Sequence, residues 1–222
     1  MLESISGKTT LLGLIGSPVG HSGSPKMYNY GFEQLGIDSV YLAFDVKEAQ
    51  VSEAIQAFRT FKMSGNVTMP CKTAVASYMD ELTPAATMVG AVNTIVHTDG
   101  KLIGHITDGI GFTENLRAHD VEVEGKNFVI LGVGGAATAI QVQLAIEGAQ
   151  SIMIFNRQDH FYQKGQETVA RIKTYYPDLA IEIHDIEDHD YLAQAIEQAD
   201  CLVNATVVGM GEDNTSTPIT DR

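Results

Sequence analysis

Apolar and polar residues follow one another along the second half of the chain in blocks that predict alternating strands and helices. Short, mostly apolar runs predict strands, and longer stretches with apolar residues three and four positions apart predict helices. The predicted order is strand 127–131, helix 135–147, strand 151–156, helix 160–175, strand 180–184, helix 191–199 and strand 201–206. Strands that alternate with helices form a parallel, right-handed, doubly wound sheet.

The first half mixes strands and helices less regularly. Ser24 and Pro25 predict a helix start, with Ser24 as the N-cap and Pro25 at the first helical position. Thr98-Asp-Gly100 lies between two apolar runs and predicts a β-hairpin. Asp108 is expected to cap the last helix. The predicted strands are 9–16, 40–46, 64–69, 91–97 and 101–106, and the predicted helices are 24–35, 47–61, 72–78, 83–90 and 108–118.

The two patterns meet between Gly111 and Gly125, which predicts two domains, 1–112 and 113–222. A chain of 222 residues is long enough for each half to bury a core of its own. The final stretch, 209–222, is polar and rich in Gly, Asn and Thr, and is expected to be a loop.

A glycine-rich turn joins the strand at 127–131 to the helix that follows it. Gly132, Gly134 and Ala137 form the pattern G-x-G-x-x-A in the strand–turn–helix context that a dinucleotide site requires. Gly132 permits the sharp turn, Gly134 lets a pyrophosphate approach the backbone, and Ala137 allows close packing of helix and strand. The helix N-terminus offers N–H groups to phosphate. The alternative is a Gly-rich turn in an α/β fold that binds no nucleotide.

Composition and charge narrow the classes of partner. The net charge of −14 argues against nucleic acid or an anionic membrane. We find no apolar run of transmembrane length and no signal-peptide pattern at the N-terminus. Cys71 and Cys201 are far apart and the 7 histidines are scattered, so we expect no metal site and a reduced, cytoplasmic protein.

Seven short segments, spread over almost the whole chain, form a joint pattern more specific than any one of them. They are His21-Ser-Gly-Ser-Pro25, Asn66-Val-Thr-Met-Pro-Cys-Lys72, Gly90-Ala-Val-Asn-Thr94, Thr107-Asp-Gly-Ile-Gly-Phe112, Gly132-Val-Gly-Gly-Ala136, Asn156-Arg157 and Asn204-Ala-Thr-Val-Val-Gly-Met210. With these segments the chain resembles the shikimate dehydrogenase family. In that family an N-terminal α/β domain binds shikimate and a Rossmann domain binds NADP or NAD. The family reaction is the reversible reduction of 3-dehydroshikimate to shikimate, in aromatic amino acid biosynthesis.

The resemblance implies a role for each matching polar residue. Two serines would bind the substrate carboxylate, three residues would bind ring hydroxyls, and a lysine would be the catalytic acid/base, paired with Asp108. The carboxylate-binding serines are Ser22 and Ser24. The hydroxyl-binding residues are Thr68, Asn93 and Asp108, and the catalytic lysine is Lys72. The implied cofactor site consists of Gly132, Gly134, Gly135, Ala136, Ala137, Asn156, Arg157, Asp159 and Thr206.

The chemistry of Lys72 agrees with that role. Hydride delivered to a ketone builds negative charge on the oxygen, and a cationic donor stabilises this charge and supplies the proton. An adjacent carboxylate favours the protonated lysine, so we expect Asp108 to position Lys72 and bind a hydroxyl. The structural alternatives are a solvated Lys72, Ser22 and Asn93 as turn residues, and Ser24 and Asp108 as helix caps.

The residues after strand 151–156 bear on the cofactor. An acid there binds the ribose 2′-hydroxyl of NAD, whereas an arginine accepts the 2′-phosphate of NADP. This chain has both Arg157 and Asp159, followed by Phe161. The run resembles the quinate/shikimate dehydrogenase branch of the family, which uses NAD as well as NADP, and Asp159 favours NAD. Alternatively, Asp159 only caps the next helix.

The match departs from the family in two places. The family usually has Asn before the Thr-Asp pair, where this chain has Ile106, so we expect altered positioning of Asp108. Family members also continue well past the segment that ends at Met210, and this sequence ends at Arg222. We therefore expect an apparently truncated Rossmann domain, in a monomer or homodimer. The alternatives to a shikimate or quinate dehydrogenase are a non-catalytic module that binds shikimate-like acids or nucleotide, and an oxidoreductase for another cyclic hydroxy acid.

Overall fold

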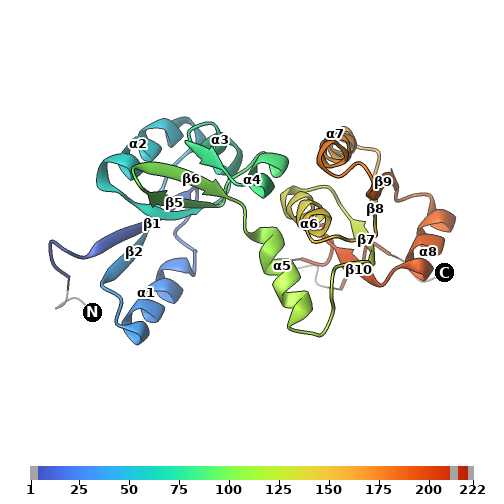
Figure 1. Ribbon diagram of the computed structural model, residues 1–222, viewed down its shortest axis with the longest axis horizontal. Helices are drawn as coiled ribbons and strands as arrows, with labels where there is room; N and C mark the ends of the chain where they lie inside the picture. The colour runs from blue at the N-terminus through green and yellow to red at the C-terminus, as the bar shows by residue number, and fades with distance from the viewer. Residues whose placement is uncertain (1–4, 211–214, 220–222) are drawn as a thin grey trace. The chain divides into compact units, whose positions relative to one another are not determined.

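The computed structural model describes residues 5–210 and 215–219, and the chain divides into two compact units (Figure 1). The first unit ends at Ile106 and the second begins at Thr107. This division lies slightly before the expected boundary at 112/113. The difference is helix α5 (Asp108–Arg117), which packs on α6 (Gly135–Ile146) and therefore belongs with the second unit.

The first unit is built on a six-stranded mixed sheet in the order β2-β1-β3-β5-β6-β4. Its first three strands are parallel, whereas β5 is antiparallel to both β3 and β6. The strands are β1 (Thr10–Gly16), β2 (Ser39–Asp45), β3 (Ser64–Val67), β4 (Glu81–Leu82), β5 (Thr94–Thr98) and β6 (Lys101–His105). The sequence did not predict β4, because two residues are too short to show a period.

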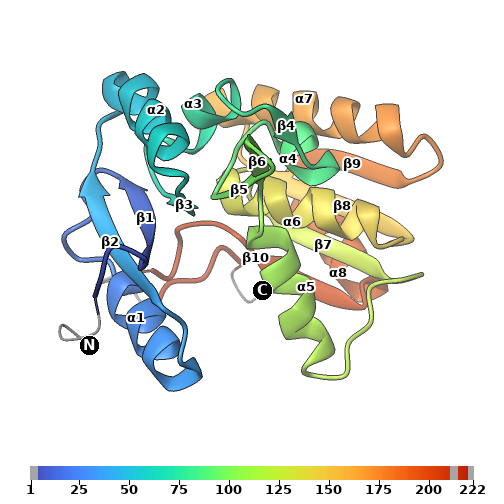
Figure 2. The same ribbon diagram turned by 60° about the vertical axis from the view of Figure 1, so that its left-hand side comes forward.

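Helices cover both sides of this sheet, with α1 (Ser24–Leu35) and α2 (Val51–Phe61) on opposite sides in Figures 1 and 2. Tyr28 and Phe32 of α1 pack against the cluster of Leu14, Val19 and Tyr41. A 3₁₀ turn (Glu48–Gln50) precedes α2, and the shorter helices are α3 (Lys72–Ala76) and α4 (Pro84–Val89).

Among the features expected at element ends, the helix start at residue 83 and the hairpin turn at 98–100 are confirmed, whereas the N-cap role of Ser24 is wrong. The Thr83 side chain accepts a hydrogen bond from the Ala86 N–H and caps α4. Asp99 and Gly100 have φ of +48° and +78°, as a tight hairpin turn requires. By contrast, Ser24 is the first residue of α1, and Gly23 occupies the N-cap position without a side-chain bond.

The second unit has a four-stranded, fully parallel sheet in the order β10-β7-β8-β9, as the alternating pattern predicted. Its strands are β7 (Asn127–Leu131), β8 (Ser151–Asn156), β9 (Ala180–Asp185) and β10 (Cys201–Asn204). The remaining helices are α7 (His160–Tyr175) and α8 (His189–Gln198). The strands β7, β8 and β9 follow one another across the sheet, and the chain then returns to place β10 on the other side of β7.

Alternating side chains explain why helices cover both faces of this sheet (Figure 2). Leu192 of α8 packs with Val129, Leu131 and Phe155 on one face. On α7, a Cβ added at Gly165 would lie 2.5 Å from a side-chain carbon of Ile183, which belongs to the opposite face. The sheet is therefore doubly wound.

Helix α5 lies directly against α6, and Gly109 makes this close approach possible. A Cβ added at Gly109 would lie 2.4 Å from the main-chain oxygen of Ala139. One turn later, Thr113 Oγ1 donates to Glu147 Oε1 over 2.8 Å. The later residue of α5, Thr113, contacts the later residue on the α6 side, Glu147, so α5 and α6 run in the same direction. The expected capping role of Asp108 is not seen, because Thr107 holds the N-cap position and Asp108 is the first helical residue.

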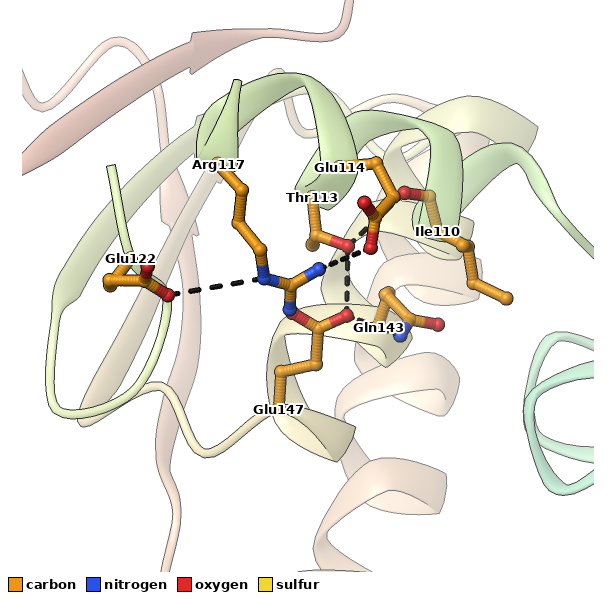
Figure 3. Close-up of polar contacts among 7 residues, drawn as sticks. All are labelled: Ile110, Thr113, Glu114, Arg117, Glu122, Gln143 and Glu147. Carbon is orange, nitrogen blue, oxygen red and sulfur yellow. Dashed lines mark hydrogen bonds and ion pairs between the residues drawn. The ribbon is translucent and has the colours of Figure 1, made fainter. Parts of the chain in front are cut away.

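The far end of this helix pair is held by the carboxylate of Glu147 (Figure 3). The Glu147 side chain is only 15% exposed. It accepts hydrogen bonds from Thr113 Oγ1, from Gln143 Nε2 at 2.6 Å and from the Arg117 guanidinium. Arg117 also pairs with Glu114 at 2.5 Å, and its Nε lies 3.9 Å from Glu122. A carboxylate with three donors fixes the position of α5 on α6.

We expect Gly109→Ala to destabilise the second unit by about 1–3 kcal/mol, because the added methyl group forces α5 away from α6. Gly111→Ala is the matched control, since a Cβ at that helical position meets nothing within 4 Å. The control should be neutral or stabilising, because alanine favours helix over glycine. Thermal unfolding of both variants tests the contact. Equal melting temperatures would show that the close approach is unimportant.

Glu147→Gln should lower the free energy of unfolding by about 1–3 kcal/mol, because it weakens a half-buried hydrogen-bonded ion pair. Glu122→Gln removes a more distant partner of the same Arg117, and its side chain is 73% exposed. That control should change stability by less than about 0.5 kcal/mol. Urea denaturation of the two variants gives the comparison, and an equal loss would assign no special role to Glu147.

Candidate functional site

Several predicted substrate residues of the first unit meet at the edge where β1 and β3 end, which we call the carboxyl edge. Because β1 and β3 are parallel and β5 is antiparallel, the residues after β3 and before β5 lie together there. The Thr68 N–H donates to the main-chain oxygen of Ile15 at 2.8 Å, and the Val67 N–H donates to that of Asn93 at 2.8 Å. Backbone bonds therefore fix Thr68 and Asn93 on neighbouring segments.

Lys72 joins the same edge as the first residue of α3, and it is half-buried. Its main-chain oxygen accepts from the Val92 N–H at 2.8 Å, next to Asn93. The preceding Cys71 is fully buried, and its Sγ lies 3.3 Å from the main-chain oxygen of Val46. Burial and the nearby Glu48 raise the pKa of the Cys71 thiol, as suits a structural residue.

The two serines follow β1 and start α1. The Ser22 N–H donates to the main-chain oxygen of Val19 at 3.0 Å, and Ser22 Oγ accepts from the Ser24 N–H at 3.3 Å. Ser22 therefore stabilises the turn, as the structural alternative expected, while Ser24 has no capping role. Both side chains are half-buried.

Asp108 lies in the second unit, as an exposed residue at the start of α5. The first unit brings Thr68, Lys72 and Asn93 to one edge, whereas the pairing of Lys72 with Asp108 stays a prediction.

The second unit contains a groove of about 370 Å³ at the carboxyl ends of its strands, which we call the second-unit groove. It opens where the strand order reverses between β7 and β10, the place where doubly wound sheets bind ligands. Apolar side chains on its walls include Phe155, Phe161 and Ile186. Of the residues predicted to bind cofactor, the groove is lined by Gly132, Gly134, Asn156, Arg157, Asp159 and Thr206.

The glycine-rich turn fits a phosphate group. Gly132 has a φ of +106°, and a Cβ there would lie 3.0 Å from the main-chain oxygen of Ala205. A Cβ at Gly134 or Gly135 would meet nothing within 4 Å, so the space in front of the turn is open. No side chain caps α6 and no acidic residue lies in its first turn. A phosphate there would meet N–H groups and the positive end of the helix dipole.

Ala136 and Ala137 contribute to this turn as part of α6. Ala137 is fully buried, which agrees with its predicted role in close helix–strand packing. Thr206 Oγ1 donates to Asn204 Oδ1 at 2.7 Å and accepts from the Val208 N–H at 3.1 Å, so the turn after β10 is held by its own side chains.

Asp159 caps a helix at the edge of the groove. Its Oδ1 accepts from the Phe161 N–H at 2.9 Å, so it caps α7, as the alternative expected. Asn156 Nδ2 donates to the main-chain oxygen of Arg157 at 2.7 Å, and both residues also line the groove. The groove therefore offers both a guanidinium and a carboxylate beyond the end of β8.

The sequence reasoning missed one wall of the second-unit groove. Ile186, Glu187 and His189 line it from the segment between β9 and α8. Because β9 is a parallel neighbour of β8, its carboxyl end reaches the same edge of the sheet. The strand prediction at 180–184 therefore already contained this signal.

The described parts of the chain hold neither a metal-binding cluster nor a membrane-spanning helix. Among residues 5–210 and 215–219, no group of three or more His, Cys, Asp or Glu side chains could hold a metal ion. No described helix is both long and apolar enough to cross a membrane.

Comparison with known proteins identifies relatives over nearly the whole chain. Residues 14–95 match the family model for the shikimate dehydrogenase substrate binding domain. Shikimate dehydrogenase (NADP(+)) from Listeria monocytogenes serotype 4b is 47% identical over 209 residues, which are 94% of this chain and 72% of that protein.

Solved structures agree with this relationship. The structure of shikimate 5-dehydrogenase from Listeria monocytogenes in complex with shikimate and NAD is 45% identical, with a TM-score of 0.93. The match covers 96% of this chain and 74% of that one. A ligand-free 5-ketofructose reductase from a Gluconobacter species is 31% identical, with a TM-score of 0.81 over 93% of this chain and 72% of that one. The chain belongs to the shikimate dehydrogenase family.

Proposed function

We propose that this chain catalyses the reversible, NAD(P)-dependent reduction of 3-dehydroshikimate to shikimate. The main support for this proposal is the similarity to one solved structure. The Listeria enzyme whose structure contains shikimate and NAD matches 96% of this chain at 45% identity. The carboxyl edge and the second-unit groove supply the two kinds of polar surface that the reaction needs. A cytoplasmic role in aromatic amino acid biosynthesis, as a monomer or homodimer, is part of the proposal.

The substrate binds through the polar residues of the carboxyl edge together with Asp108. Ser22 and Ser24 hydrogen-bond its carboxylate, while Thr68, Asn93 and Asp108 bind its ring hydroxyls. A hydroxyl-rich ligand requires this density of polar groups, because a buried donor or acceptor without a partner is costly. The site discriminates against ligands that lack a hydroxyl more strongly than against those that add a methylene.

Proton transfer is the work of Lys72. A nicotinamide cofactor, when bound, would supply the hydride for the ketone carbon, or accept one from the alcohol carbon in the reverse direction. Lys72 donates its proton to the oxygen as negative charge develops there, and takes it back in the oxidation. Asp108 orients the Lys72 ammonium group and accepts a hydrogen bond from a neighbouring hydroxyl.

In the second-unit groove, Gly132, Gly134 and the start of α6 would hold the pyrophosphate of the cofactor. Arg157 and Asp159 would hold the adenosine ribose, and the Asp159 carboxylate would accept hydrogen bonds from ribose hydroxyls and repel a 2′-phosphate. This arrangement favours NAD while still allowing NADP. Activity with quinate is proposed as a secondary property.

We expect Lys72→Ala to lower kcat by about 10²–10⁴-fold and to change KM much less, because the proton donor is lost. The assay follows reduced-nicotinamide formation with shikimate and quinate, each with NAD and NADP. Lys101→Ala is the control, since this lysine of the β5–β6 hairpin has a side chain that is 57% exposed and pairs with Glu81. It should retain wild-type turnover.

Unchanged turnover in Lys72→Ala would remove this residue from the mechanism. If the folded wild-type chain shows no turnover but binds shikimate in calorimetry, the alternative of a non-catalytic binding module is favoured. If it binds neither shikimate nor a nicotinamide cofactor, the proposed function is wrong.

Asp159→Ser should raise the ratio of kcat/KM with NADP to that with NAD by about 10-fold, because it removes a carboxylate near the 2′-phosphate. Serine is also a good N-cap, so α7 should keep its start. Asp188→Ser is the matched control: Asp188 caps α8 through the Tyr191 N–H at 3.2 Å. An equal change in both variants would contradict the assignment of Asp159 to the ribose.

A further inference from the structure

We propose that the buried hydroxyl of Tyr41 is a positioning group for the substrate site, acting on Asn93 through Asn66 and Thr94. This inference rests on the proposed function, in which Asn93 binds a ring hydroxyl. It assigns to Tyr41 a role in deciding which end of the Asn93 carboxamide meets the substrate. All four residues belong to the first unit.

A continuous series of hydrogen bonds connects the four side chains. The Tyr41 hydroxyl donates to Asn66 Oδ1 at 2.8 Å, and Asn66 Nδ2 donates to Thr94 Oγ1 at 3.1 Å. The Thr94 hydroxyl then donates to Asn93 Oδ1 at 3.0 Å. The series crosses the sheet from β2 to β3 and on to β5, so three strands contribute to the placement of one side chain.

The direction of these bonds follows from one group that can only accept. The main-chain oxygen of Asn93 lies 3.4 Å from Asn66 Nδ2, and a carbonyl oxygen has no proton to give. Asn66 must therefore turn its Nδ2 toward Asn93 and Thr94, and its Oδ1 toward Tyr41. Since that oxygen is also an acceptor only, the Tyr41 hydroxyl must be the donor.

The last bond of the series runs from the Thr94 hydroxyl to Asn93. Thr94 Oγ1 receives a proton from Asn66 and has one proton of its own, which it gives to Asn93 Oδ1. The Asn93 carboxamide is thereby held with its oxygen toward Thr94. Asn93 then meets a substrate hydroxyl as a donor, through Nδ2, and selects for a hydroxyl oxygen placed to accept.

Tyr41 is suited to start the series because its ring is buried and stacked on a neighbouring ring. The side chain is 1% exposed, and the ring stacks on Tyr28 of α1 with centroids 4.4 Å apart and planes 11° apart. Burial raises the pKa of the Tyr41 phenol well above its usual value, so the hydroxyl keeps its proton at any working pH. A fixed donor at one end gives the series a single direction.

The test compares Tyr41→Phe with Tyr28→Phe. The two substitutions each remove one hydroxyl from the same stacked pair, but among the described residues no hydrogen bond of the Tyr28 hydroxyl is found. We expect Tyr41→Phe to raise KM for shikimate by about 3- to 10-fold, the effect of one net hydrogen bond, with kcat changed less than about twofold. Tyr28→Phe should match the wild type in both constants.

A double-mutant cycle shows whether Tyr41 acts through Asn93. In an Asn93→Ala background, Tyr41→Phe should have no further effect on KM, because the group that it positions is gone. An undiminished effect in that background would overturn the inference. Thr94→Val breaks the last bond at a half-buried position and should reproduce the effect of Tyr41→Phe. If Tyr41→Phe fails to fold, the KM of Thr94→Val for shikimate tests the inference in its place.

A measurement without substrate separates this inference from the proposed function. The side-chain amide signals of Asn93 in the ¹⁵N-labelled protein, assigned by their loss in Asn93→Asp, should shift in Tyr41→Phe and Thr94→Val but not in Tyr28→Phe. If these signals do not move, the inference is wrong even if shikimate is turned over. If they move but the wild type neither binds nor converts shikimate, the proposed function fails and the positioning of Asn93 stands.

Discussion

The parallel pairing of β1 with β3 is the constraint on which the first unit depends. Gly13 and Gly65 face each other in this pair, and a Cβ at Gly65 would lie 1.9 Å from the main-chain oxygen of Gly13. Only glycine allows so close an approach of two backbones. Because the two strands run in the same direction, the loops that follow them reach one edge. Strand pairing therefore brings Thr68, and the short turn that leads to Lys72, to this edge.

In the second unit, too, the loops that follow parallel strands reach one edge of the sheet, but this edge has a different composition. There the carboxyl end of β7 leads into a turn that presents backbone N–H groups, because Gly132 and Gly134 carry no side chain. An edge of backbone donors suits a phosphate, whereas the side-chain-rich edge of the first unit suits a ligand with many hydroxyls. One architectural principle thus produces two kinds of binding surface in one chain.

Sequence patterns predicted the second unit almost residue by residue, because buried parallel strands and amphipathic helices have strong periods. Strands 127–131 and 151–156 have the predicted bounds. The patterns failed where geometry depends on distant partners. The bounds 24–35 of α1 were predicted, but the N-cap role of Ser24 was wrong, because Ser22, two residues earlier, supplies the hydroxyl at this turn. The bonds from Tyr41 to Asn93 were invisible, because they join residues on three different strands.

The boundary between the units places Asp108 in a different unit from the one that the sequence predicted. The sequence assigned this residue to the same domain as Lys72, yet α5 is fixed to α6 at both ends, by the close approach at Gly109 and by the carboxylate of Glu147. Asp108 is therefore built into the unit that carries the glycine-rich turn, and Lys72 into the other. A reaction that uses both residues depends on contributions from both units. Substitutions in α6 that loosen α5 would accordingly act on Asp108 without touching the carboxyl edge of the first unit.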